Sequence, residues 1–221
     1  IVEDTYLAHR HWGKRIESYS LSNKPTLKKR TFAAMNVPER PEFSLEYVPL
    51  EVSFPNQGDY REPSVQIRMS NGYTVSRFSY EKFEISDGVP DFIAFPHARD
   101  LPASDSQTLT IHLVDSISSI RLLLFYTIFE DADVIIRSSK IINESNSGVT
   151  IEKLYSASVD MRYDSQMCTT FYGTHQKEYQ LNRQPISHGK FSVGSSRGAS
   201  GPQYPPYLSI SKDATEFSGD V

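Results

Sequence analysis

The chain has 221 residues, is 38% hydrophobic and 23% charged, and carries a formal net charge of -4 at pH 7. This length fits one large all-β domain with a packed core, although two domains are also possible. The acidic balance argues against nucleic acid as a partner, because phosphate-binding surfaces carry clustered Lys and Arg. No apolar stretch approaches the roughly 20 residues that span a bilayer, so no membrane segment is expected.

Proline interrupts the first sixty residues repeatedly, at Pro25, Pro38, Pro41, Pro49 and Pro55. Since proline cannot donate to a sheet ladder, we expect short strands and extended loops there. The only basic run of the chain, Lys28 to Arg30, lies in this region and is typical of a solvated turn.

Alternating apolar and polar residues then predict strands with one buried face. Val65, Ile67 and Met69 form the first such set, and Asn71-Gly72 after it predicts a hairpin turn that leads to a second strand over 73–77. Leu109, Ile111 and Leu113 predict another half-buried strand, on which His112 faces outward.

The run from Leu122 to Phe129 is almost wholly apolar, which is typical of a central strand covered on both faces. Val134–Ile142 is the expected partner of this strand, and Asn143–Gly148 is a turn before the strand that begins at Val149. The residues between the two central strands, Glu130, Asp131 and Asp133, are interpreted as a charged turn.

Ser192–Pro206 is rich in Gly, Ser and Pro and predicts a loop, after which Tyr207–Ile210 resumes strand alternation. The pattern amounts to a dozen or more short strands. We therefore predict an all-β fold, a large sandwich of antiparallel strands in two facing sheets, with an up-and-down barrel as the alternative.

Few residues suggest a catalytic or metal site. The single cysteine, Cys168, excludes an internal disulfide and favours a reducing compartment, and no signal peptide is visible. His9 and His11 could share a strand face, but no nearby carboxylate or cysteine completes a metal site, so a surface pair is expected. No serine-hydrolase elbow or nucleotide-binding glycine pattern occurs. We expect no metal and no cofactor.

Several strings, in order along the chain, resemble the N-terminal domain of family 36 glycoside hydrolases, the α-galactosidases of raffinose and melibiose metabolism, here of a bacterial type. They are Tyr6–Leu7, His11–Ile16, Phe43–Glu46, Gly58–Pro63, Tyr126–Glu130, Val134–Ser138, Ser156–Asp160 and Ser196–Ser200. Within them, Arg61 and Arg137 are expected to bind backbone carbonyls or a carboxylate. The chain departs from the family pattern at His11, where an aromatic residue is common, and at Tyr60, which replaces Phe.

The resemblance implies that residues 1–221 form one galactose-mutarotase-like supersandwich, which precedes a (β/α)8 barrel. Two aspartates on that barrel would perform a retaining reaction. The family's nucleophile lies in a K-W-D-x-N-R-like stretch, and the only tryptophan here, Trp12, is followed by Gly13. The resemblance therefore predicts no catalytic residue in this chain, which should be inert on its own.

The resemblance also implies a homotetramer, whose N-terminal loops reach toward a neighbouring subunit's sugar pocket, and the reducing compartment expected from Cys168 would be the cytoplasm. The proline-broken stretch Leu27–Phe43 is the expected loop, with Arg40, Lys28 and Lys29 as candidate substrate-binding residues. Arginine suits this role because its planar guanidinium can bridge two sugar hydroxyls. The alternative function is an independent carbohydrate-binding module.

Overall fold

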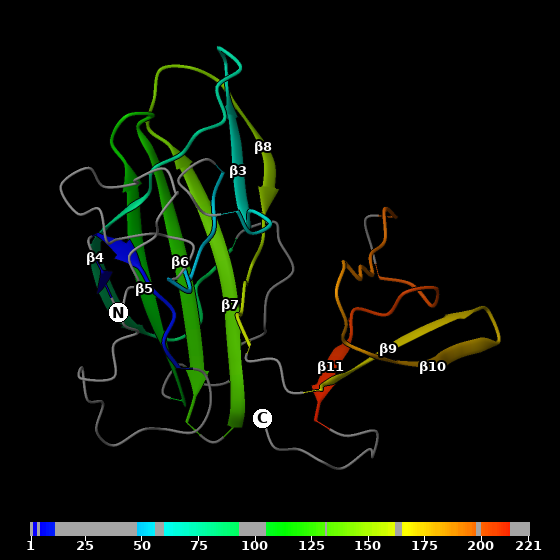
Figure 1. Cartoon of the computed structure of the whole chain (residues 1–221). Helices are drawn as coiled ribbons and strands as arrows, with labels where there is room; N and C mark the ends of the chain where they lie inside the picture. Colours follow the sequence, from blue (N-terminus) through cyan, green and yellow to red (C-terminus); the bar gives the residue numbers. More distant parts are fainter. Residues whose placement is uncertain are drawn as a thin grey trace. The chain divides into compact units, whose positions relative to one another are not determined.

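The computed structural model describes residues 2–3, 5–11, 48–55, 60–92, 105–130, 132–161, 165–197 and 200–212. These ranges contain eleven strands and no α-helix, hence no helix long and apolar enough to cross a membrane. The chain divides into two compact units, unit 1 over Ile1–Asp160 and unit 2 over Met161–Val221 (Figure 1). The all-β prediction is confirmed, whereas a single domain over 1–221 stays a prediction.

The largest sheet of unit 1 has four antiparallel strands in the order β4-β5-β6-β7. Their bounds are Ser79–Asp87, Ser106–Asp115, Ile120–Phe129 and Ala132–Asn143. The strand β6 lies inside the sheet, and its side chains from Leu122 to Phe125 are buried on both faces. The predicted central strand and its partner over 134–142 are therefore confirmed.

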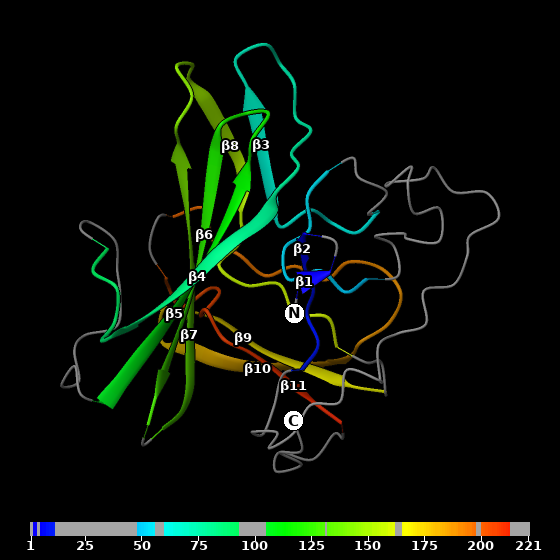
Figure 2. The ribbon, with the colours of Figure 1, turned by 90° about the vertical axis from the view of Figure 1, so that its left-hand side faces the viewer.

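A second layer covers one face of this sheet (Figure 2). It contains residues 48–55 and four strands: β1 (Val2–Glu3), β2 (Tyr6–Leu7), β3 (Val65–Met69) and β8 (Val149–Leu154). The strand β1 pairs with β2, and β3 pairs with β8, both antiparallel. Between the layers, Tyr6, Val48 and Ile67 pack in one apolar cluster with Leu122 and Leu124. Two facing antiparallel layers around one core form the predicted β-sandwich.

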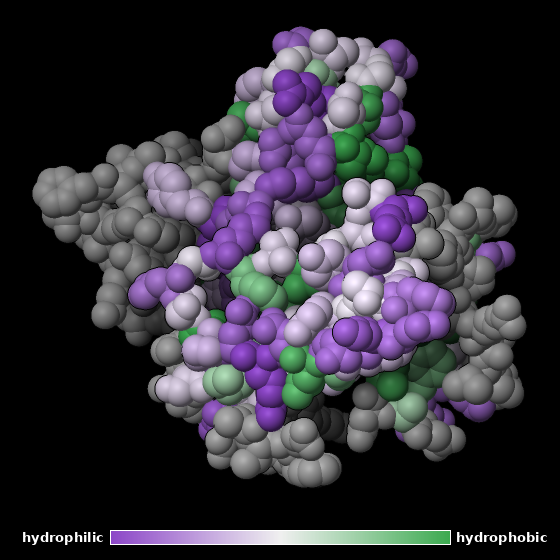
Figure 3. Space-filling model, turned by 90° about the vertical axis from the view of Figure 1, so that its right-hand side faces the viewer, coloured by the Kyte–Doolittle hydropathy of each residue, from purple (hydrophilic) through white to green (hydrophobic). Residues whose placement is uncertain are grey.

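The core does not extend over the whole sheet face. The register places Phe83 and Ile85 of β4 beside Ile111 and Leu109 of β5, on the core side. Phe83 and Ile85 are nevertheless 58% and 63% exposed, and Ile128 on the same face of β6 is 51% exposed. Figure 3 shows further hydrophobic side chains near the top of the molecule, where Figure 1 places β3 and β8. Apolar surface of this kind marks places where other molecules pack.

Unit 2 contains a three-stranded antiparallel sheet in the order β10-β9-β11. The bounds of β9, β10 and β11 are Met167–Thr174, Lys177–Pro185 and Leu208–Ser211. Among its described residues only Cys168, Thr170 and Pro205 are buried. The predicted loop over 192–206 contains no strand in its described part, and β11 confirms the strand expected after it.

Of the hairpin predicted at Asn71-Gly72, the turn is confirmed and the second strand is wrong. The turn forms, since Gly72 has a φ of 83° and its N–H donates to the Met69 carbonyl at 2.8 Å. Residues 73–78 form no strand, however, and β3 pairs with β8 instead. The reason is Phe78, which is 2% exposed and packs edge-on against Phe54, so the chain turns into the core rather than along β3.

Two smaller expectations also differ from the structure. His112 lies on the face of β5 away from the core, as predicted, but its side chain is only 13% exposed. The charged turn is shorter than expected, because β7 begins at Ala132 and includes Asp133.

Candidate functional site

Backbone pairing with β2 holds the segment that carries Glu51. The Pro49 carbonyl accepts a hydrogen bond from the His9 N–H at 2.7 Å, and the Leu7 carbonyl accepts one from the Glu51 N–H at 3.0 Å. Glu51 is 8% exposed, so its carboxylate is directed into the protein. A charged group in such surroundings persists only when hydrogen-bond partners compensate its lost hydration.

Three side chains supply that compensation, and together with Glu51 they form what we call the Glu51 cluster. The Tyr126 hydroxyl donates to Glu51 Oε1 at 2.6 Å, Arg137 Nη2 donates to the same oxygen at 2.9 Å, and His9 Nδ1 lies 2.9 Å from Oε2. Tyr126 and Arg137 are cross-strand partners on β6 and β7. The Arg137 guanidinium lies 3.7 Å from the centroid of the Tyr126 ring, a cation–π contact.

The surroundings of Tyr126 keep its phenol protonated. Burial is the main cause that raises the pKa of Tyr126 far above its usual value, and the negative charge of Glu51 adds to it, against the opposing effect of Arg137. Tyr126 therefore acts as a hydrogen-bond donor. The Arg137 side chain is 8% exposed, and its Nη1 is buried without a hydrogen-bond partner among the described residues.

The Glu51 cluster is suited to holding the layers together and unsuited to hydrolysis. Glycoside hydrolysis needs two carboxyl groups roughly 5 to 10 Å apart, one of them free to attack or to pass a proton. Glu51 is the only carboxylate of the cluster, and three donors already surround it. Nor does any group of three or more His, Cys, Asp or Glu side chains that could hold a metal occur in the described part of the chain.

A second group of charges lies on the opposite face of the sheet. Arg121 bonds both Glu81 and Glu144, and these hydrogen bonds raise the pKa of its guanidinium, with Glu81 as the larger cause. Beside them Lys82 donates to Glu84 at 2.5 Å and lowers the pKa of that carboxyl. Each of these carboxylates is engaged by a cation, so none of them is free to attack a sugar.

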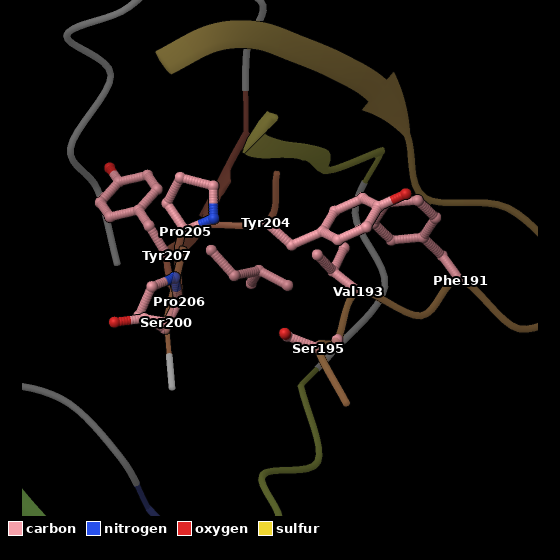
Figure 4. Close-up of a pocket in the computed structure, with 10 residues that line it drawn as sticks. Phe191, Val193, Ser195, Ser200, Tyr204, Pro205, Pro206 and Tyr207 are labelled. Carbon is pink, nitrogen blue, oxygen red and sulfur yellow. The ribbon is translucent and has the colours of Figure 1, made fainter. Parts of the chain in front are cut away.

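Unit 2 contains a pocket of a different character, with a cavity volume of about 490 Å³. In Figure 4, Tyr204 and Phe191 lie on one side of it and Tyr207 lies with Pro205 and Pro206 on the other. The ten residues that line it include no Asp, Glu, Lys, Arg or His. We call this space the aromatic pocket.

The model of the glycosyl hydrolase family 36 N-terminal domain matches residues 5–221. The chain belongs to this family. Alpha-galactosidase Mel36A of Lactobacillus acidophilus is 30% identical over 97% of the chain, and alpha-galactosidase 2 of the fungus Hypocrea jecorina is 36% identical over 75% of it. The chain covers 30% and 22% of these relatives' lengths. The expected bacterial origin is consistent with such relatives, although fungal ones also match.

Solved structures of family 36 enzymes have the same fold. The alpha-galactosidase AgaA of Geobacillus stearothermophilus matches 97% of the chain with a TM-score of 0.90 at 26% identity, and the chain covers 30% of its length. A variant of AgaA in complex with raffinose matches 95% of the chain with a TM-score of 0.88 at 27% identity, over 29% of its own length.

Of the residues predicted from the family 36 resemblance, the structure describes the two arginines Arg61 and Arg137 but not the candidate substrate-binding residues. Arg40, Lys28 and Lys29 lie outside the described residues. Arg61 donates to Asp160 at 2.8 Å and to the Val48 carbonyl at 2.8 Å, and Arg137 donates to Glu51, so both arginines bind as expected.

The histidine pair was predicted wrongly in one respect. His9 is not a surface residue, because its side chain is 12% exposed and contacts a carboxylate, Glu51, that is remote in sequence. His11 is exposed.

Sequence reasoning missed Glu51 and Tyr126. The string Tyr126–Glu130 marked a strand that belongs to the family pattern, but nothing in it identifies the partner of the tyrosine hydroxyl. Glu51 has no local signal at all, since its three partners lie 42, 75 and 86 residues away along the chain.

Removal of the charge of Glu51 should destabilise the chain strongly. Glu51→Gln leaves the buried Arg137 without a counter-ion, and breaking a buried pair in this way costs about 3 to 5 kcal/mol of unfolding free energy. Glu62→Gln, which breaks the exposed pair with Lys153, is the matched control and should cost far less, because a solvent-exposed ion pair contributes little to stability. Urea unfolding measures both, and equal losses would show that the Glu51 cluster is not the buried ion pair described.

Tyr126 should also make the chain less stable in alkali. Its folded-state pKa is raised, so as pH rises past about 10 the unfolded state loses this proton first, and stability falls by up to about 1.4 kcal/mol per pH unit. In Tyr126→Phe this part of the slope should disappear. Unfolding free energies between about pH 9 and pH 11 test it, and the difference at pH 7 gives the cost of the lost hydrogen bond, about 1 kcal/mol. An unchanged slope would contradict the assignment.

Proposed function

We propose that this chain is the non-catalytic N-terminal part of an α-galactosidase that hydrolyses terminal α-galactosyl groups of oligosaccharides such as raffinose and melibiose. The observation that carries the proposal is the family match over residues 5–221, together with relatives that are named alpha-galactosidases and extend well beyond the matched region. The complex of an AgaA variant with raffinose supports this class of substrate.

In this proposal the reaction takes place on polypeptide outside the chain. Two aspartates on a (β/α)8 barrel would act in a retaining double displacement, one as nucleophile and the other as acid and then base. Two observations support this division. The K-W-D string of the family is missing from the sequence, and the carboxylates of the two charged groups described above are engaged by cations.

The role of the chain in the enzyme is then assembly and shaping of the pocket rim. The enzyme would be a cytoplasmic homotetramer, in which the loop Leu27–Phe43 approaches a neighbouring subunit's pocket. Arg40 would contact the sugar directly, with Lys28 and Lys29 as further candidates, because a guanidinium can bridge two sugar hydroxyls.

The alternative is an independent carbohydrate-binding module. The aromatic pocket favours it, since uncharged aromatic pockets suit neutral ligands. Sequence beyond Val221 separates the two functions, because an enzyme requires a barrel with the K-W-D string there, and an unrelated domain would favour the module.

Hydrolysis of a chromogenic α-galactoside tests the main proposal. The full-length protein should release the chromophore, whereas the 221-residue chain should show no turnover above a buffer control, because it lacks the catalytic pair. Turnover by the chain alone would refute the assignment of catalysis to the barrel, and an inactive full-length protein would refute the activity.

Replacement of Arg40 should weaken catalysis in the full-length enzyme. If the guanidinium holds the sugar, Arg40→Ala should raise KM or lower kcat by about tenfold or more, the equivalent of one strong hydrogen bond. Arg68→Ala removes an exposed cation of β3 that is paired with Glu152 and is the matched control. Thermal stability should be unchanged in both variants. Kinetics for Arg40→Ala that equal those of the control would remove Arg40 from the site.

A further inference from the structure

We propose that the aromatic pocket of unit 2 is a binding site for a neutral pyranoside, whose sugar ring stacks on Tyr204 or Tyr207. The main function proposed above, the N-terminal part of an α-galactosidase, assigns no ligand to this pocket. The class of sugar expected, a galactose-containing oligosaccharide, rests on that proposed function. The existence of the site rests on the geometry of unit 2 alone.

The aromatic pocket offers large ring surfaces to a ligand. Phe191, Tyr204 and Tyr207 are 47%, 51% and 50% exposed and face the same cavity (Figure 4). Exposed aromatic rings in a concave site are unusual for a monomeric protein surface and mark binding sites. The C–H groups on one face of a galactopyranose ring form an apolar patch that fits flat against such a ring.

The rings of the aromatic pocket are held in place before a ligand arrives. Tyr207 packs against Phe171 of β9 with ring centroids 5.1 Å apart, and its N–H donates to the Pro205 carbonyl at 2.8 Å. Pro205 is buried and Pro206 follows it, which restricts the backbone between the two tyrosines. A site fixed in this way loses little conformational entropy on binding.

A close approach of two backbone segments anchors the same loop to the sheet. The Gly173 N–H donates to the Gln203 carbonyl at 3.3 Å, one residue before Tyr204. A Cβ at Gly173 would lie 2.4 Å from the Lys177 carbonyl oxygen and 3.2 Å from the Pro202 carbonyl oxygen, so only glycine fits. The loop that carries Tyr204 is therefore fixed against β9.

The charge of the aromatic pocket selects the class of ligand. None of its ten lining residues carries a charge, which disfavours phosphates, nucleotides and acidic sugars because these need cations. The polar side-chain groups that remain are hydroxyls, which both donate and accept. Ser195 Oγ accepts a hydrogen bond from the Arg197 N–H at 3.3 Å, and no described residue accepts its own hydrogen, which can donate to a ligand. Hydroxyls beside aromatic rings match a neutral polyhydroxylated ring.

The size of the cavity agrees with this ligand. A volume of about 490 Å³ lies within the roughly 300 to 1,000 Å³ of small-molecule sites, enough for one or two sugar rings. The competing occupant is a polypeptide segment that packs on the rings, since few side chains are buried among the residues of unit 2 that the structure describes. The two occupants differ in one measurable respect, because only a ligand site takes up free sugar.

Calorimetric titration of the 221-residue chain with raffinose tests the inference, after thermal unfolding has shown that each variant is folded. Wild type should bind raffinose, and Tyr204→Ala or Tyr207→Ala should weaken binding at least about tenfold. Tyr172→Ala is the matched control, since Tyr172 is a half-exposed tyrosine of β9 that does not line the pocket, and it should change the affinity less than about twofold.

Two outcomes would overturn the inference. They are no binding of raffinose by the folded wild-type chain, and equal binding by wild type and both pocket variants. If equal binding is accompanied by a lower melting temperature in the pocket variants only, the rings are a packing surface. The outcome is separable from that of the proposed function. A full-length enzyme that hydrolyses galactosides while the pocket variants bind normally refutes only this inference, and sugar binding without any hydrolysis refutes only the activity.

Discussion

The ion pair between Glu51 and Arg137 is the constraint on which the structure of unit 1 depends. Both side chains are almost fully buried, so each has lost its hydration and is tolerated only beside the other. Glu51 belongs to the layer of residues 48–55, and Arg137 to β7 of the four-stranded sheet. The pair therefore specifies how the two layers face each other, which an apolar core alone would leave less strictly determined.

Further hydrogen bonds, in the layer of Glu51 and on the sheet, restrict how the two layers face each other. Ser53 and Ser64 bond each other reciprocally, with each N–H 3.0 Å from the other's hydroxyl oxygen, and so tie residues 48–55 to the start of β3. On the sheet, the cross-strand register of Tyr126 and Arg137 brings both donors to one carboxylate oxygen. A slip of β7 by one residue would turn Arg137 to the opposite face and leave Glu51 without its counter-ion.

The sequence predicts the strands of unit 1 well where the burial of a strand follows its local pattern. The continuous apolar run of β6 and the alternation in β5 both indicate a strand that packs against the core, and both strands do so. The pattern fails where a single distant contact decides the path, as at Phe78, which turns the chain into the core and prevents the expected second arm of the hairpin. The Glu51 cluster could not be predicted for the same reason. Only Tyr126 and Arg137 lie near each other in the sequence, and the other two members lie far from them and from each other.

The strings that resemble family 36 have a structural meaning of the same kind. Gly58–Pro63 and Ser156–Asp160 are about a hundred residues apart, yet Arg61 of one binds Asp160 of the other. Tyr126–Glu130 and Val134–Ser138 each contribute one member to the Glu51 cluster. Each of the two arginines, Arg61 and Arg137, binds a carboxylate far away along the chain, so part of the family pattern consists of long-range contacts within unit 1.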